Sequence, residues 1–190
     1  MNLIGYSAMK DLESASSVSS TVSMFIYASI VGPIVEELVY RGFVLRSFQK
    51  YGKLAAVIIS SILFGVMHAN LPQSMFAFGV GLILGYVAVE YSIVWSIVLH
   101  IINNCIFGDI FGWAISGLSE QMQEYISGGV LIVFGVVAVF IIWWKRNVIK
   151  AFFEENRTEN KICRYVFSSC GMLLFVLGEV HMAIMMLQKL

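Results

Sequence analysis

Long apolar runs alternate with short polar segments along most of the chain, a pattern typical of helices that cross a membrane. The hydrocarbon core of a bilayer requires about 20 mostly apolar residues per helix. Six runs at or near that length lie at residues 22–47, 54–69, 75–89, 93–111, 129–144 and 165–187. The second and third are short for a full crossing, as in tilted or re-entrant helices. The sequence therefore predicts an all-α fold, a polytopic membrane helix bundle of about six transmembrane helices.

Gly32 and Pro33 interrupt the first of these runs. Proline has no amide hydrogen to donate, and its ring clashes with the preceding helical turn. The first helix is therefore predicted to kink or restart near Gly32, with residues 34–47 as a separate helical rod.

Composition supports a membrane protein and argues against a water-soluble globule. Hydrophobic residues make up 59% of the 190 residues and charged residues only 13%, whereas soluble domains carry about 25% charged residues. The formal net charge is zero, so no overall field attracts nucleic acid. The length predicts a single integral membrane domain over residues 1–190.

The basic residues give an independent test of the helix count. Nine of the twelve Lys and Arg residues fall in two stretches, 46–53 and 145–164, whereas the intervening loops at 70–74 and 112–128 contain none. Basic residues concentrate in the short loops on the cytoplasmic side of a membrane. Six helices place both basic stretches on one side and both chain ends on the other.

Several polar residues interrupt the apolar runs. An ionisable group at the centre of a membrane helix costs about 2.5 to 3.5 kcal/mol, so such groups usually face the bundle interior and function there. They are Glu36, Glu37, Arg41, His68, His100, Asn103, Asn104, Glu179 and His181. Glu179 and His181 are expected to contact headgroups, and Asp109, Glu120 and Glu124 to face water.

Glu37 and Arg41 are four residues apart with the acid first, the favourable order for an ion pair within a helix. We expect this pair to neutralise itself and orient the helix. Glu36 points about 100° away around the helix and has no such partner. Its carboxylate is therefore expected to face a cavity.

His68 ends the second run, and His100 and Asn104 project together from the fourth because they lie four residues apart. Singly, these residues are typical of polar contacts between helices. Three polar groups on three helices are expected to gather around one hydrated cavity. There a carboxylate and an imidazole could activate water, while a second imidazole and an amide stabilise an oxyanion. Glu36, His68 and His100 could alternatively bind a metal such as zinc, and spacing does not choose between the two.

These motifs resemble those of a known family. Glu36-Glu37-x-x-x-Arg41-Gly42, Phe64-x-x-x-His68 and His100-x-x-x-Asn104 are similar to the three motifs of the CPBP or Abi family of intramembrane proteases, which includes CAAX prenyl endopeptidases and proteins of bacteriocin processing or immunity. The resemblance implies that Glu36 and His68 activate the hydrolytic water, that His100 and Asn104 form the oxyanion pocket, and that Glu37 and Arg41 support the site. It also favours a mechanism without a bound metal or other cofactor.

The resemblance implies a catalytic core at 22–111 followed by two additional membrane helices at 129–187. The expected function is hydrolysis of a peptide bond in a membrane-associated or lipidated, CAAX-like protein or peptide, by a multi-pass protein of the cell membrane. The expected partners are membrane lipid and this substrate, and no nucleic acid. Two alternatives remain: a catalytically silent protein of bacteriocin self-immunity or regulation, and an ion or proton pathway.

Overall fold

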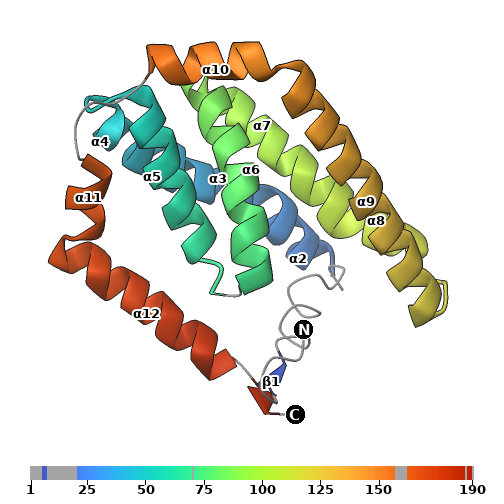
Figure 1. Ribbon diagram of the computed structural model, residues 1–190. Coiled ribbons are helices and arrows are strands. Elements are labelled where there is room, and N and C mark those ends of the chain that lie inside the picture. Colours follow the sequence, from blue (N-terminus) through green and yellow to red (C-terminus); the bar gives the residue numbers. More distant parts are fainter. Residues whose placement is uncertain (1–5, 8–20, 70, 157–161, 187, 190) are drawn as a thin grey trace.

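The computed structural model of the chain describes residues 6–7, 21–69, 71–156, 162–186 and 188–189, and these are almost entirely helical (Figure 1). The strands consist of one antiparallel pairing of two residues each, β1 (Tyr6–Ser7) with β2 (Gln188–Lys189), which joins the two chain ends. The predicted all-α fold is confirmed.

The first rod runs without a break from Val22 to Gln49, so the prediction of a separate helix over 34–47 is wrong. It contains α2 (Val22–Ile26), the π-helical η1 (Tyr27–Val31), α3 (Gly32–Glu37), the π-helical η2 (Leu38–Leu45) and α4 (Arg46–Gln49). Pro33 cannot donate to the carbonyls one turn before it. The helix widens into η1 there instead of breaking, and side chains from another helix donate to the carbonyls of Ala28 and Ser29.

The second and third helices form a tightly packed hairpin, α5 (Lys53–Val66) and α6 (Leu71–Glu90). Small residues allow the two backbones to approach closely. A Cβ atom added at Gly65 would lie 2.8 Å from the carbonyl oxygen of Ser74, and one at Gly81 would lie 3.2 Å from Ser61. Because α5 ends at Val66, His68 lies in the turn beyond the helix.

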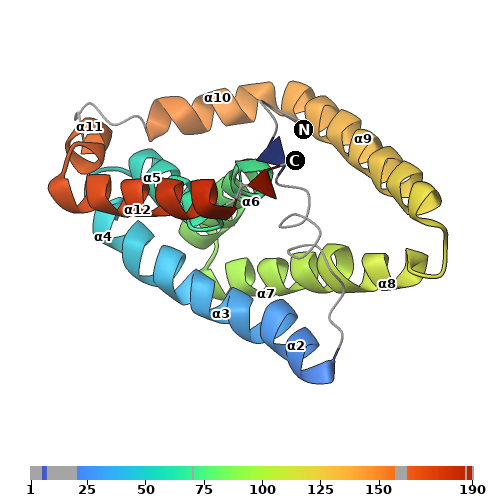
Figure 2. The same cartoon turned by 90° about the horizontal axis from the view of Figure 1, so that it is seen from below.

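The second long rod comprises α7 (Ile93–Asn103), the π-helical η3 (Asn104–Ile110) and α8 (Phe111–Ile115). It lies beside the first rod, with α7 against α3 and η3 against η1, and α6 packs against α7 (Figure 2). These contacts bring the three predicted motifs into one region.

The rest of the chain lies at the periphery. It comprises α9 (Glu120–Trp144), α10 (Arg146–Glu155), α11 (Ile162–Phe167) and α12 (Cys170–Met186). No residue of α9 is buried. No helix was predicted over α10, which touches α6 through the rings of Phe152 and Tyr86. The predicted helix at 165–187 is interrupted between α11 and α12, which pack against α5.

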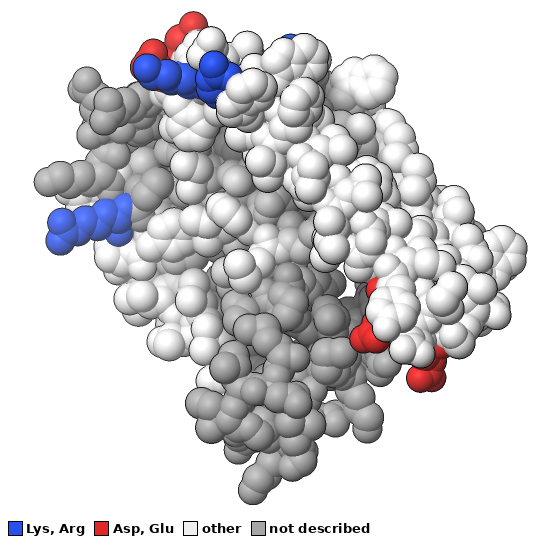
Figure 3. All heavy atoms as spheres, turned by 45° about the vertical axis from the view of Figure 1, so that its right-hand side comes forward, with Lys and Arg blue, Asp and Glu red and all other residues white. Residues whose placement is uncertain are grey.

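Within the described residues, four helices are long and apolar enough to cross a membrane: Val22–Gln49, Gln73–Glu90, Ile93–Ile115 and Glu120–Trp144. Two further apolar helices, Lys53–Val66 and Cys170–Met182, are shorter, so the count of six crossings is not established. The ends of α4, α9 and α10 lie at one end of the molecule (Figure 1), and Figure 3 shows basic side chains at its upper edge and another lower down on one side. The placement of both basic stretches on one side of a membrane stays a prediction, because the helix count on which it depends is not established.

Candidate active site

Glu37 is the centre of a buried polar cluster. Its Oε1 lies 2.8 Å from Nη1 of Arg41, and neither side chain is exposed. The predicted ion pair is therefore confirmed. Two side chains of α7 reach the same carboxylate: Ser96 donates to Oε2 at 2.5 Å and His100 Nδ1 lies 2.9 Å from Oε1. Glu37 thus joins α3 to α7 in the apolar interior.

Arg41 extends this cluster to the α5–α6 hairpin. Its Nη2 donates to the carbonyl oxygen of Gly81 at 3.1 Å, and its guanidinium lies 4.4 Å from the ring centroid of Phe64. A desolvated cation is attracted to the face of an aromatic ring. Edge-on contacts place the same Phe64 ring against three further rings, those of Tyr40, His68 and His100. Phe64 therefore connects the second motif to the other two.

Glu36 occupies the more open side of the cluster, because 28% of its side chain is exposed. Its Oε2 lies 3.7 Å from Nε2 of His100, and it also interacts electrostatically with His68. The imidazole of His100 therefore lies between two carboxylates, with Nδ1 toward Glu37 and Nε2 toward Glu36. Glu36 and Glu37 therefore approach different nitrogens of one imidazole, and the cavity expected beside Glu36 stays a prediction.

His68 is held by the last turn of α5. Its Nδ1 lies 2.9 Å from the carbonyl oxygen of Phe64, and because a carbonyl only accepts, Nδ1 carries the proton. The lone pair is then on Nε2, so this nitrogen can accept a proton or a hydrogen bond from water. His68 is half-buried and contacts the edge of the Phe64 ring.

Asn104 begins η3, one turn beyond His100. Its Nδ2 donates to the carbonyl oxygen of Ala28 at 3.2 Å, and its Oδ1 accepts from Asn103 at the same distance. The carbonyl of Ala28 is one of those that Pro33 cannot hydrogen-bond, because proline has no N–H to donate. An Asn amide has two hydrogens, so one remains for another acceptor after this contact.

The three candidate metal ligands, Glu36, His68 and His100, are not gathered into one set. In the described parts of the chain, no three His, Cys, Asp or Glu side chains lie close enough together to bind one metal ion.

Asp109 was expected to face water, and this prediction is wrong. Its side chain is buried in η3, where Oδ2 accepts a hydrogen bond from the hydroxyl of Ser29 in η1. Glu120 and Glu124 are exposed, as predicted. Glu179 of α12 is half-buried and interacts electrostatically with Tyr40.

Sequence reasoning missed Ser29 and Ser96, which are both fully buried. Serine is common in membrane helices and usually bonds to its own backbone. The position of Ser96, one turn before His100, was the available signal.

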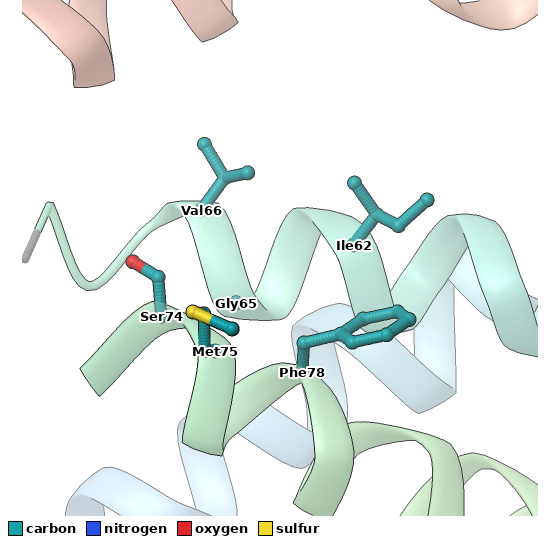
Figure 4. A pocket seen from close by; sticks show the side chains of 6 residues that line it. All are labelled: Ile62, Gly65, Val66, Ser74, Met75 and Phe78. Atoms are coloured by element: carbon teal, nitrogen blue, oxygen red, sulfur yellow. The ribbon is translucent and has the colours of Figure 1, made fainter. Parts of the chain in front are cut away.

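A separate apolar groove lies between α5 and α6 (Figure 4) and is lined by Ile62, Gly65, Val66, Ser74, Met75 and Phe78. Ile62 and Val66 each lie two residues away from Phe64 on α5, so they face the other side of that helix. The groove is lined by no titratable side chain and shares no lining residue with the polar cluster.

The segment with these motifs matches a class of membrane peptidases. Residues 18–106 match the family described as Type II CAAX prenyl endopeptidase Rce1-like, and this range contains every predicted site residue. The chain is also 31% identical over 83 residues to the Putative membrane peptidase YdiL of Bacillus subtilis (strain 168). That match covers 43% of this chain and 34% of the relative, so the chain spans about a third of its length. No solved structure matches significantly.

The predicted resemblance to CAAX prenyl endopeptidases is thus confirmed for residues 18–106. The protein is an all-helical integral membrane protein whose motif-bearing segment is similar to CAAX-type membrane peptidases.

Proposed function

We propose that the protein is an intramembrane endopeptidase that hydrolyses a peptide bond of a membrane-associated or lipidated, CAAX-like protein or peptide. The observation that carries this proposal is the position of His100 between Glu36 and Glu37, with Arg41 beside them. Four ionisable groups inside an apolar bundle are expensive, and such groups usually serve function.

The charges of this cluster suit His100 for donating a hydrogen bond. Two carboxylates face one guanidinium, so a proton on the imidazole makes the four groups neutral. Neutral clusters are favoured where charges are removed from water. A protonated His100 keeps one N–H on Glu37 and offers the other, at Nε2, to an acceptor beside Glu36.

In the proposed reaction, Glu36 accepts a proton from a water molecule that His68 Nε2 helps to orient, and the water oxygen bonds to the carbonyl carbon of the substrate. The carbonyl electrons move onto their oxygen, which accepts hydrogen bonds from His100 Nε2 and the remaining amide hydrogen of Asn104. The C–N bond then breaks, and Glu36 returns its proton to the leaving nitrogen. Glu37 and Arg41 hold His100 in place.

We propose that this chemistry runs without a bound metal or another cofactor, because each step uses a group of the chain itself. The cell membrane is the proposed location, with several helices crossing it. Membrane lipid and the peptide or protein substrate are the proposed partners, and the zero net charge gives no basis for binding nucleic acid.

The test compares membranes that contain the wild-type protein with membranes that contain Glu36→Gln, an isosteric change that removes the proton acceptor. Mass spectrometry should find a new peptide terminus with the wild type and none with Glu36→Gln. Glu124→Gln, an exposed acid outside the site, is the matched control and should cleave like the wild type. Equal product from wild type and Glu36→Gln would remove Glu36 from the mechanism.

The same variant distinguishes a protein that acts by binding alone. A resistance or signalling phenotype that survives Glu36→Gln would indicate immunity or regulation through a partner rather than peptide hydrolysis.

A further inference from the structure

Ser96 of α7 has an unusual set of contacts for a serine in a membrane helix. It is fully buried, and its Oγ lies 2.5 Å from Oε2 of Glu37 and 3.0 Å from the carbonyl oxygen of Leu84. Ser96 therefore connects its own helix to both α3 and α6.

Two other buried serines of the bundle, both in α5, behave differently. The hydroxyls of Ser60 and Ser61 in α5 both donate to the carbonyl oxygen of Val57, in their own helix. This local bond is the usual choice of serine in a helix. Ser96 instead directs its single proton between two acceptors on other helices and lies closer to the carboxylate.

Ser96 and His100 lie one turn apart on the same face of α7 and contact different oxygens of one carboxylate. Ser96 reaches Oε2 of Glu37, and His100 Nδ1 reaches Oε1, which also accepts from Arg41. A carboxylate held at both oxygens cannot rotate about its terminal bond. The orientation of the Glu37 carboxylate therefore sets which nitrogen of the His100 imidazole faces this carboxylate.

We propose that Ser96 is a positioning residue, which fixes the Glu37 carboxylate so that His100 keeps Nδ1 on Glu37 and presents Nε2 to Glu36. Ser96 acts through Glu37 and does not touch the substrate. Without its hydroxyl, the carboxylate turns toward Arg41 and the His100 ring loses its fixed orientation. The geometric part of this inference is independent of the proposed function, and only its effect on catalysis rests on that function.

The test is NMR of the whole protein in lipid nanodiscs with ¹⁵N-labelled histidine. The chain has three histidines, so His100 is assigned by comparison with His68→Gln and His181→Gln. In the wild type, the Nδ1 proton of His100 should exchange slowly with solvent. Hydrogen bonds to charged groups contribute about 1.5 to 3 kcal/mol, so Ser96→Ala should accelerate this exchange by about tenfold or more.

Three further variants make the result specific. Ser96→Thr keeps the hydroxyl and should retain the wild-type His100 signals. Ser61→Ala removes a buried hydroxyl that donates only to its own helix backbone in the described contacts, and it should also leave them unchanged. Ser96→Cys supplies a weaker donor and decides the question if Ser96→Ala does not fold. The proposal is overturned if a folded Ser96→Ala or Ser96→Cys protein shows the same Nδ1 proton exchange rate and the same ¹⁵N shifts of His100 as the wild type.

Cleavage gives a second, separable measurement. With a peptide that the wild type cleaves, Ser96→Ala should lower kcat by about tenfold and leave KM unchanged, because the lost contact does not touch the substrate. Ser96→Thr should restore kcat. If the wild type cleaves no peptide, the proposed function fails, while the NMR experiment still decides the role of Ser96.

Discussion

His100 Nδ1 lies 2.9 Å from Oε1 of Glu37, in a part of the bundle where Glu37 has no exposed surface. The neighbouring Glu36 approaches the other nitrogen of the same imidazole but is partly exposed. Two adjacent glutamates therefore have different environments, and the difference can be measured.

Glu37→Gln should destabilise the protein strongly, because it leaves the buried charge of Arg41 without its counterion. Removing one partner of a buried ion pair typically costs about 3 to 5 kcal/mol. Glu36→Gln is the same chemical change one residue away and should reduce the free energy of unfolding by less than about 1 kcal/mol. Denaturant unfolding in detergent micelles measures the free energy of unfolding of both variants. Equal losses would show that the Glu37–Arg41 pair does not hold the bundle together.

The α5–α6 hairpin gives a second prediction, based on packing. A Cβ atom at Gly65 would lie 2.8 Å from the backbone oxygen of Ser74, so Gly65→Ala requires the two helices to separate. Overpacking of this kind typically costs about 1 to 3 kcal/mol. Gly79 lies in the same hairpin with nothing within 4 Å of an added Cβ. Gly79→Ala should be neutral or stabilising, because alanine favours helix more than glycine does.

Thermal unfolding of the two glycine variants against the wild type is the measurement. A Gly65→Ala protein as stable as Gly79→Ala would indicate that the hairpin is looser than the structure describes.

Several features of the fold could be predicted from local sequence. The apolar runs predicted the positions of the main helices, and the spacing of Glu37 and Arg41 predicted their ion pair, because both depend on residues close together in the chain. α10 was missed because its ten residues mix charged and apolar side chains within a basic stretch. A segment of ten residues is too short to cross a membrane, so the apolar runs alone do not predict a helix there.

Contacts between distant parts of the chain could not be predicted in the same way. Ser96 meets Glu37, and Ser29 meets Asp109, only because α3 and η1 lie beside α7 and η3. The first helix was expected to kink or restart near Gly32 because of Pro33. Donors from Asn104 and Cys105, which are more than 70 residues away in the sequence, reach the carbonyls before it instead.

The Ser29–Asp109 contact joins η1 to η3 and should contribute to the packing of the two long rods. Residues that share a hydrogen bond show coupling energies of about 0.5 to 3 kcal/mol in double-mutant cycles. Ser29→Ala, Asp109→Asn and the double variant should therefore be non-additive in the free energy of unfolding. Ser29→Ala combined with Glu124→Gln is the matched control, because Glu124 is exposed and lies in a different helix, α9.

Additive losses for Ser29 and Asp109 would indicate that other contacts of Asp109 hold η3 in place, and that the hydroxyl contributes little.

Removal of metal ions tests the proposed chemistry. A catalytic zinc has three protein ligands at about 2.0 to 2.2 Å. Glu36 and His100 lie near each other, but His68 is not gathered with them, and its Nδ1 donates to Phe64. Peptide cleavage by purified protein should therefore persist after dialysis against a strong chelator, and added zinc should not increase it. Loss of cleavage on chelation with recovery on adding zinc would show that His68 joins Glu36 and His100 around a metal during turnover, and it would replace the water-activation scheme proposed above.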